Sequence, residues 1–505
     1  MAETDPVKKA LITVAVMLGT IMQTLDSTIA NVALPHMQGS LNAAQDQISW
    51  VVTSYVVAAA IGLSLTSFLS ERYGRRRMLV ISIVGFTISS VMCGAAQSLG
   101  QIVVFRMIQG FCSGWIIPLC QAALMDVYPR EKQSQAMAMW GMGVMVGPVI
   151  GPTLGGYLTE FYNWRWVFLI NLPIGIIATI AYLTLLDETK RAPRHHFDMM
   201  GFGFLAVGLC SLQLMLDRGQ TLDWFSANEI IVEAFVAVVA LYLFVVHILT
   251  TPKPFISLTP FKDRNYSLGL GVMFFCGAVP IATMVLLPLL LQSLMGYPVQ
   301  TAGMLMAPRG FGTMFAMAMM PRAIPLFGPR PLIIGGLLCM AASMWAMSSF
   351  TIDTPASMIA WVGLFQGAVM GMIFVPLNSM AFATIEKRFI TEAASLYHLM
   401  RNMGSSIGVS FVVTLLARNT QVVRSELTEF VNPYSQAMQK YSADFATNPT
   451  TGLSILNSEI NKQAAMAGYI DDFVIMMILS LVMVPVIFAF KAGRPQPPQA
   501  AQMHE

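Results

Sequence analysis

Long apolar stretches alternate with short polar connections along almost the whole chain of 505 residues. About 20 apolar residues in a helix, each adding about 1.5 Å, span the hydrocarbon core of a bilayer. Fourteen stretches meet this requirement, near residues 10–34, 48–70, 78–97, 99–125, 134–158, 164–186, 199–216, 229–250, 267–294, 300–320, 330–350, 357–382, 393–416 and 469–490. The pattern therefore predicts an all-α membrane protein with 14 transmembrane helices.

The positions of Lys and Arg give the orientation of these spans, because cytoplasmic connections carry an excess of positive charge. With the N-terminus in the cytoplasm, 20 of the 29 Lys and Arg residues lie in cytoplasmic connections. The short outer connections hold only Arg165 and Arg218, four more basic residues lie in the long outer connection 417–468, and three lie inside spans. An odd number of spans would break this alternation, so both termini are predicted to be cytoplasmic.

Composition supports a membrane protein and excludes several other classes. Hydrophobic residues make up 56% of the chain and charged residues only 11%, against about 25% charged in soluble domains. A net charge of +3 argues against nucleic-acid binding, which needs a basic face. All six cysteines lie in apolar stretches, so a disulfide framework is not expected.

No enzyme motif is present in the sequence. It has no phosphate-binding Walker loop, no spaced His/Cys metal set and no nucleophile elbow. We therefore expect neither enzymatic activity nor a cofactor or metal, and an ion gradient is the expected source of energy.

A weak internal duplication divides the spans into two sets. Gln109-Gly110 with Gly114 recurs as Gln366-Gly367 with Gly371, each in a span that leads to a proline. Related halves with a polar site between them near the middle of the membrane are typical of secondary transporters. Removing the two spans at 199–250 leaves six on either side, a 6+2+6 arrangement. The predicted segments are an N-terminal six-helix bundle (1–186), a two-helix insertion with its connections (187–266), a C-terminal six-helix bundle (267–490) with a long periplasmic loop (417–468), and a disordered cytoplasmic tail (491–505).

The first span contains a carboxylate, Asp26, where hydrocarbon is expected. An Asp at the centre of a membrane helix costs about 2.5–3.5 kcal/mol, and chains that keep one usually use it for ions, protons or a polar substrate. Arg106 lies in the fourth span, and because arginine is always charged it must face a cavity or a carboxylate. We predict that Asp26 and Arg106 couple proton movement, with Gln23 as a polar neighbour on the helix face of Asp26.

Several motifs make a family resemblance specific. Residues 67–76, SFLSERYGRR, resemble the inner-loop signature of the major facilitator superfamily, G-x-L-a-D-R-x-G-R-K, with Ser and Glu in place of its first Gly and its Asp. Residues 106–110, RMIQG, resemble the fourth-helix signature R-x-x-Q-G, and the Gly and Pro residues between 143 and 156 resemble the fifth-helix signature of its proton antiporters. LDSTIANVALP at 25–35 is similar to the first helix of its fourteen-helix drug:proton antiporter family.

The resemblance implies a major facilitator fold and a proton-coupled antiporter that exports hydrophobic toxic compounds, antibiotics included, across the bacterial inner membrane by alternating access. It implies the pump of a tripartite efflux system, with an EmrA-like periplasmic adaptor and a TolC-like outer-membrane channel as partners. The loop 417–468 is the expected adaptor contact, because it is the one large segment predicted on that side. A proton-coupled uptake symporter for an organic anion is the alternative, and a membrane sensor that does not transport is a third possibility.

Three groups of residues are predicted to carry the mechanism. The inner-loop gate comprises Glu71, Arg72, Gly74, Arg75, Arg76 and Asp126. Within it, Arg72 is expected to pair with Asp126, and such an interfacial pair contributes about 0–1 kcal/mol. The substrate pathway comprises Gln23, Asn31, Gln109, His398 and Arg401. The antiporter helix comprises Gly143, Gly147, Pro148, Gly151, Pro152 and Gly155, whose glycines allow close backbone packing and whose prolines allow a bend. The plain alternatives are topology signalling by the arginines and ordinary small-residue packing by the glycines.

Overall fold

The computed structural model describes residues 6–129, 132–188, 197–252, 254–429 and 449–490. Fourteen long helices occupy these ranges and coincide with the 14 predicted spans. Their bounds are α1 Pro6–Ser40, α3 Trp50–Tyr73, α4 Arg75–Ala95, α5 Leu99–Val127, α6 Gln133–Phe161, α8 Asn171–Leu185, α9 Met199–Arg218, α10 Asn228–Thr250, α11 Arg264–Leu289, α12 Val299–Phe327, α13 Pro329–Ser348, α14 Ala356–Phe382, α15 Ile390–Glu429 and α18 Pro449–Phe488. Short helical turns at Gln45–Ile48 (α2), Trp166–Leu169 (α7), Trp224–Ser226, Pro260–Lys262, Leu290–Leu294 and Lys387–Phe389 connect or extend them.

Thirteen of the helices in the described residues are both long and apolar enough to cross a membrane. The exception is α12, which has 29 residues but includes two arginines and three prolines in its sequence. The predicted all-α membrane fold is confirmed, and α12 is the span in which polar residues replace part of the apolar surface.

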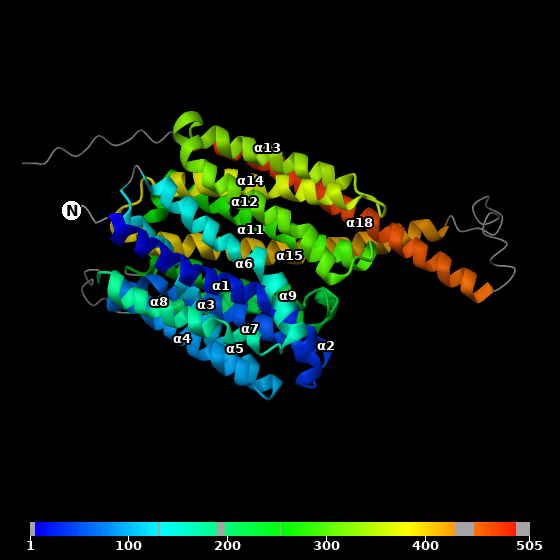
Figure 1. Cartoon of the computed structure of the whole chain (residues 1–505), viewed down its shortest axis with the longest axis horizontal. Coiled ribbons are helices and arrows are strands. Elements are labelled where there is room, and N and C mark those ends of the chain that lie inside the picture. The colour runs from blue at the N-terminus through cyan, green and yellow to red at the C-terminus, as the bar shows by residue number, and fades with distance from the viewer. Residues whose placement is uncertain (1–5, 130–131, 189–196, 253, 430–448, 491–505) are drawn as a thin grey trace, which may run out of the picture.

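The helices form two groups that repeat the same packing. In the first group α1 packs on α6, α3 on α5 and α4 on α8; in the second α11 packs on α15, α12 on α14 and α13 on α18 (Figure 1). Gly74 separates α3 from α4 and Gly328 separates α12 from α13, with φ of 93° and 80°. Both angles lie in the left-handed region that glycine adopts without strain. The duplication seen in the sequence is therefore a duplication of helix packing. The boundaries predicted for the two six-helix bundles, the insertion and the tail stay predictions.

The inserted helices α9 and α10 pack on each other, and α9 contacts both groups. On one side Thr53 of α3 donates a hydrogen bond to Asp217 of α9. On the other side Ser406 of α15 donates to Gln213 of α9 (2.6 Å), and the Trp224 indole donates to Thr414 of α15 (3.1 Å). The insertion therefore lies along the boundary between α3 and α15 and is bonded to each.

Asp198 caps the start of α9 and makes the folding of the insertion depend on pH. Its carboxylate accepts a hydrogen bond from the Gly201 N–H (2.9 Å) and contacts His247 Nε2 of α10 (2.9 Å). Partial burial opposes ionisation, but the Gly201 N–H and the His247 ring together lower the pKa of Asp198 below its ordinary value. The stabilisation it supplies is thus present above the unfolded-state pKa of about 3.9 and is lost as the pH falls through the lower folded-state value.

Replacing Asp198 by Ala should therefore reduce stability at pH 7 by about 1 kcal/mol, the usual contribution of a helix N-cap. The difference in Tm between wild type and Asp198→Ala should shrink below about pH 4, because both proteins then lack the ionised cap. Asp198→Asn is the matched control, since an amide can still cap the helix but does not titrate. A Tm difference for Asp198→Ala that is the same at acid and neutral pH would contradict this account.

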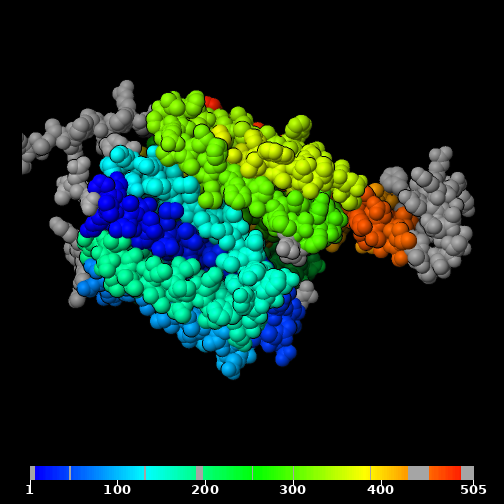
Figure 2. Space-filling model, viewed as in Figure 1, coloured from blue at the N-terminus to red at the C-terminus, as the bar shows by residue number. Residues whose placement is uncertain are grey.

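In the long outer connection 417–468 the sequence indicates helical character around residues 419–431 and 453–466, and the described parts of both stretches are helical. Helix α15 continues to Glu429 and α18 begins at Pro449, so both extend past the bundle as an antiparallel pair. This projection is visible at one end of the molecule (Figures 1 and 2). Forty residues of helix measure about 60 Å, twice the hydrocarbon thickness of about 30 Å. The tail 491–505 predicted to be disordered lies outside the described residues.

The two helices of this connection pack on each other. The Arg424 guanidinium donates to the Asn457 side chain across the pair (3.3 Å), and Asn419 donates to Asp471 (3.3 Å). Gly468 packs against Leu416 and Thr420. Helices paired in this way need only one narrow contact face and can be polar elsewhere. We call the pair formed by residues 417–429 and 449–468 the projecting hairpin.

Candidate functional site

The predicted pair of Asp26 and Arg106 is a direct contact. Asp26 lies on α1 with its side chain fully buried, and Arg106 reaches it from α5 with 1% of its side chain exposed. Arg106 Nη1 donates to Asp26 Oδ2 at 2.7 Å. Two opposite charges are thus enclosed between helices within the first half of the chain, where a partner for each is required.

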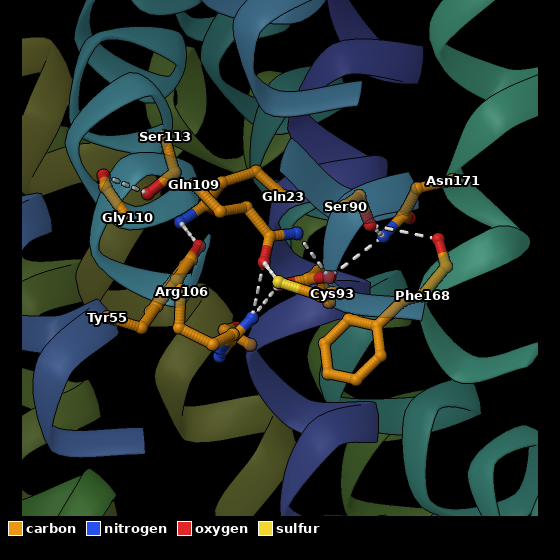
Figure 3. Close-up of polar contacts among 12 residues, drawn as sticks. Gln23, Tyr55, Ser90, Cys93, Arg106, Gln109, Gly110, Ser113, Phe168 and Asn171 are labelled. Carbon is orange, nitrogen blue, oxygen red and sulfur yellow. Dashed lines mark hydrogen bonds and ion pairs between the residues drawn. The ribbon is translucent and has the colours of Figure 1, made fainter. Parts of the chain in front are cut away.

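Two amide side chains complete the hydrogen bonding of the Asp26 carboxylate. Gln109 Nε2 donates to Asp26 Oδ1 at 2.9 Å, and Asn171 Nδ2 of α8 donates to the same oxygen at 2.8 Å. Asn171 Nδ2 also donates to Ser90 Oγ at 3.0 Å. Figure 3 shows the side chains of Arg106 and Gln109, both from α5, and of Asn171, from α8, around this site. Four helices, α1, α4, α5 and α8, therefore contribute to one polar network.

Arg106 is held by further contacts besides the ion pair. Its Nε donates to the Val51 carbonyl (3.1 Å) and its Nη1 to Gln109 Oε1 (2.8 Å). The guanidinium also lies over the Tyr55 ring, 4.0 Å from the ring centroid. Such a cation–π contact contributes about 2 kcal/mol when it is desolvated. Arg106 can therefore keep several partners if its bond to Asp26 is broken.

Three side-chain donors address the two oxygens of the Asp26 carboxylate. One of the three, the Arg106 guanidinium, is charged, and each carboxylate oxygen accepts at least one hydrogen bond, which is what a buried carboxylate requires.

Two other predicted pathway residues of α1 lie outside this network. Gln23 is half-buried and donates to the Tyr55 hydroxyl at 3.5 Å, while its Oε1 is buried without a hydrogen-bond partner. Asn31 is exposed, and its amide donates only weakly to the Ser27 carbonyl at 3.4 Å. Gln23 therefore reaches the site only through Tyr55, whose ring contacts Arg106. Asn31 does not contact the Asp26 network.

The antiporter-helix glycines of α6 pack directly on α1. A Cβ on Gly147 would collide with the Thr24 backbone, and one on Gly151 would collide with the Thr28 side chain. Gly155 faces Ile29 in the same way, whereas Gly143 makes only ordinary contact distance with a Met side chain. Thr28 Oγ1 donates to the Gly147 carbonyl (3.1 Å). Gly147, Gly151 and Gly155 therefore bring α6 against the helix that carries Asp26, and helix α6 stays continuous through Pro148 and Pro152.

The inner-loop gate uses a different arginine from the one predicted. Arg75, rather than Arg72, forms the ion pair with Asp126. Arg75 Nη2 also donates to Thr391 Oγ1 of α15 (2.9 Å), so it links the two halves. Arg72 is exposed and lies near the rings of Phe68 and Tyr73. The prediction failed because α3 ends at Tyr73 and α4 begins after Gly74, which turns Arg75 toward α5.

The other gate residues surround this turn. A Cβ on Gly74 would collide with the Glu188 carboxylate, which accepts a hydrogen bond from the Arg76 N–H (3.2 Å). Arg76 also donates to the Leu183 carbonyl, and Arg77 pairs with Glu188 at 3.8 Å. Glu71 is exposed. Gly74 is required here both by its φ and by the approach of Glu188.

His398 belongs to a polar cluster that joins the halves at the same end of the bundle. Gln121 Nε2 of α5 donates to Asn378 Oδ1 of α14 (3.0 Å), and His398 Nε2 of α15 contacts Gln121 Oε1 (2.7 Å). The Trp140 ring of α6 stacks on Phe374 of α14, with ring centroids 5.9 Å apart. This end is the predicted cytoplasmic end, so the halves are bonded to each other there.

The remaining pathway residue, Arg401, is half-buried on α15. Its carbonyl oxygen lies against Gly277 of α11, which leaves no room for a Cβ. It is not part of the cluster around Gln121. Of the five predicted pathway residues, Gln109 lies in the Asp26 network with Gln23 at its margin, and His398 lies at the cytoplasmic junction. Asn31 and Arg401 lie in neither place.

Sequence reasoning missed Asn171, Tyr55, Gln121 and Asn378 as members of these networks. Asn171 lies in the stretch WRWVFLINLPIG at 164–175, which also resembles the drug:proton antiporter family and is the one signal in the sequence for this residue. Gln121 and Asn378 are single amides within apolar spans, and a polar residue at such depth usually bonds across helices. That general signal could have selected them, but it could not have identified the partners.

This architecture is that of a membrane transporter with two related helix bundles. The family model of the Major Facilitator Superfamily matches residues 16–409. The chain belongs to the major facilitator superfamily, whose members are transporters and not enzymes.

Relatives within the superfamily narrow the assignment. The chain is 36% identical to the fatty acid resistance protein FarB of Neisseria gonorrhoeae, covering 95% of this chain and 96% of that protein. It is 38% identical to the multidrug export protein EmrB of Escherichia coli K12, covering 85% and 84%. Identity at this level over most of both chains confirms the predicted resemblance to multidrug export proteins of the EmrB type.

Solved structures agree on the fold. The human organic anion transporter MFSD10 matches with a TM-score of 0.62 at 15% identity, covering 94% of this chain and 100% of that one. The proton:xylose symporter XylE matches with a TM-score of 0.60 at 16% identity, covering 95% and 96%. At such identity the likeness extends to the fold and not to substrate or direction of transport.

Proposed function

We propose that this protein is a proton-coupled antiporter that exports hydrophobic compounds across the bacterial inner membrane by alternating access. The observation that carries the proposal is the buried Asp26–Arg106 ion pair with its amide donors. A carboxylate in such a place can hold either a proton or a guanidinium but not both in the same geometry. Switching between these two states couples proton binding to a movement of the helices that carry Asp26 and Arg106.

The coupling cycle follows from the contacts of α1. A proton that reaches Asp26 from the outer side neutralises it and weakens its bond to Arg106. Helix α1 then shifts relative to α5, and α6 moves with α1 because Gly147 and Gly151 lie against it. Since Trp140 of α6 stacks on Phe374 of the other half, that movement reaches the cytoplasmic junction. Opening of this junction admits cargo, and release of the proton to the cytoplasm restores the ion pair.

The energy available is sufficient for useful export. One proton moving down about 100 mV supplies about 2.3 kcal/mol, which sustains a concentration ratio of some tens. The Arg75 and Gln121 contacts that must open each contribute of the order of 1 kcal/mol. A cycle driven by one proton can therefore break and remake them.

Export rather than uptake is supported by two observations. The glycine-rich α6 keeps α1 closely packed, which suits an antiporter that must not leak protons. Relatives at 36–38% identity are named for resistance to fatty acids and for multidrug export. The uptake symporter for an organic anion is the alternative, and it predicts accumulation of substrate in cells instead of exclusion. Efflux of a drug panel from vesicles under an imposed pH gradient, in wild type and Asp26→Asn, tests the proposal.

We further propose that the projecting hairpin binds an EmrA-like periplasmic adaptor, which links the pump to a TolC-like outer-membrane channel. The hairpin extends past the bundle at the end opposite the Gln121 junction, and among the described residues it is the largest segment that does so (Figure 2). The two helices have many polar residues and extend beyond the end of the helix bundle.

Deleting residues 424–457 and joining the helices by a short Gly-Ser turn should abolish co-purification with the adaptor. The same variant should keep proton-driven transport in proteoliposomes, because the Asp26 network is remote from the deletion. Co-purification that is unchanged after the deletion would contradict the adaptor proposal. Replacing the same residues by an unrelated helical hairpin of equal length controls for loss of bulk.

A further inference from the structure

The second half of the chain contains a buried arginine without an acidic partner. Arg309 of α12 is 7% exposed and is absent from the ion pairs of the described residues. Its Nη2 donates to the Pro280 carbonyl of α11 at 2.8 Å, but its Nη1 is buried with no hydrogen-bond partner. A guanidinium is charged at every accessible pH, and such a charge in a protein interior requires an anion.

An unpartnered amide lies on the adjoining helix. Gln366 of α14 is fully buried, and both its Oε1 and its Nε2 lack partners. Its neighbour Gly367 packs directly on the carbonyl of Arg309, so α12 and α14 are closest at this level. Gly363, one turn away from Gly367, faces the Arg309 Cβ at 3.9 Å and has no other atom within 4 Å. The structure thus has unused donors on two adjoining helices at this level.

The duplication shows which group this site has lost. In the first half Gly110 packs on the Tyr55 carbonyl, as Gly367 packs on that of Arg309. Arg309 therefore occupies the position of Tyr55, in the layer where Arg106 meets Asp26. Both halves place a guanidinium in this layer, although on different helices.

The counterpart of Asp26 is found in the same way. Gly147 and Gly151 pack on Thr24 and Thr28 of α1, while Gly404 and Gly408 pack on Phe274 and Ala278 of α11. The residue midway between Thr24 and Thr28 is Asp26, and the residue midway between Phe274 and Ala278 is Cys276. Cys276 is buried and carries no charge near neutral pH. The second half therefore has a guanidinium in this layer but no acid at the position equivalent to Asp26.

We infer that Arg309 and Gln366 bind an oxyanion of the cargo, a single carboxylate on an amphipathic molecule. Arg309 Nη1 supplies a charged donor and Gln366 Nε2 a neutral one, which suits the two oxygens of a carboxylate. The proposed ligand takes the place that Asp26 fills in the first half. The inference rests on the proposed export function for the nature of its ligand, but binding itself does not require transport.

The experiment compares two probes that differ in one group, pyrenebutyrate and pyrenebutanol, binding to the full-length protein in phosphatidylcholine nanodiscs. Arg309→Gln should weaken pyrenebutyrate binding by about tenfold or more, because it removes the charged donor. Gln366→Leu should weaken it less, and both variants should bind pyrenebutanol as the wild type does. Cys276→Ser is a control and should leave both affinities unchanged.

Three results would overturn the inference. Equal affinity of folded wild type and Arg309→Gln for pyrenebutyrate would show that Arg309 does not bind the carboxylate. Equal loss of both probes would indicate a changed site shape instead of lost anion recognition. Displacement of pyrenebutyrate by added phosphatidylglycerol would assign the site to a lipid headgroup. Proton-driven export of a neutral drug by Arg309→Gln tests the proposed function separately, since it depends on Asp26 and not on this site.

Discussion

Arg106→Leu destabilises the protein by about 3–5 kcal/mol, the usual result of removing one partner from a buried ion pair. The variant leaves the Asp26 carboxylate fully buried with only the Gln109 and Asn171 amides as donors. Thermal unfolding in detergent, followed through a thiol-reactive dye, measures the effect because Cys93, Cys120 and Cys276 are free and buried.

The double variant Asp26→Asn/Arg106→Leu distinguishes an uncompensated charge from lost packing. Removing both charges should restore most of the stability, because a buried pair replaced by neutral groups is often no less stable than the pair. Arg72→Leu, which removes an exposed arginine, should change stability by no more than about 0.5 kcal/mol. A double variant as unstable as Arg106→Leu alone would show that Asp26 and Arg106 are not energetically linked.

Asp26→Asn uncouples transport from the proton gradient. The amide keeps nearly the same shape and can still hydrogen bond to Arg106 and Gln109, but it cannot take up a proton at physiological pH. The steady-state concentration ratio of an exported drug should fall from some tens at about 100 mV to unity. Exchange of drug down its own gradient should continue, since the pathway is intact.

Transport assays in vesicles separate these two activities. Wild type and Asp26→Asn are compared for drug accumulation under an imposed pH gradient and for drug exchange without one. Asp26→Glu is the control that retains a titratable group. Loss of both activities in Asp26→Asn would indicate a structural role for Asp26 and would argue against a role as proton carrier.

The sequence predicted the helices well because the signal is local. A run of about 20 apolar residues is sufficient to define a span, whatever its neighbours are. The weakest case was α12, where Arg309 and its prolines reduce the apolar character. Asp26 and Arg106 could each be singled out, because a charge is costly in a membrane. The sequence left open whether Arg106 faces a cavity or a carboxylate, and the structure shows the carboxylate of Asp26.

The details that failed depend on how helices pack and turn. Four arginines follow one another around Gly74, and composition cannot tell which one faces Asp126; the helix break at Gly74 decides in favour of Arg75. Asn171 could not be assigned to Asp26 because the contact depends on α8 packing against α1. The sequence indicates helical character at both ends of the outer connection, but it could not show that the two helices pair with each other.

The Arg309 site illustrates what only the structure adds. Nothing in the sequence indicates that Arg309 is equivalent in position to Tyr55. Nor does it indicate that Cys276 is equivalent in position to Asp26. Those equivalences come from matching glycine contacts in the two halves. A buried arginine can thus pair with an acid of the same chain in one half, as Arg106 does, and be a candidate ligand site in the other half, as Arg309 is.

The most direct test of proton coupling at Asp26 measures both ions and cargo in the same vesicles. Proteoliposomes containing a pH-sensitive dye receive a drug gradient and no imposed pH gradient. Wild type should move protons in the direction opposite to the drug, Asp26→Glu should do so as well, and Asp26→Asn should move drug without protons. The same proton movement per drug molecule in Asp26→Asn as in wild type would contradict the account.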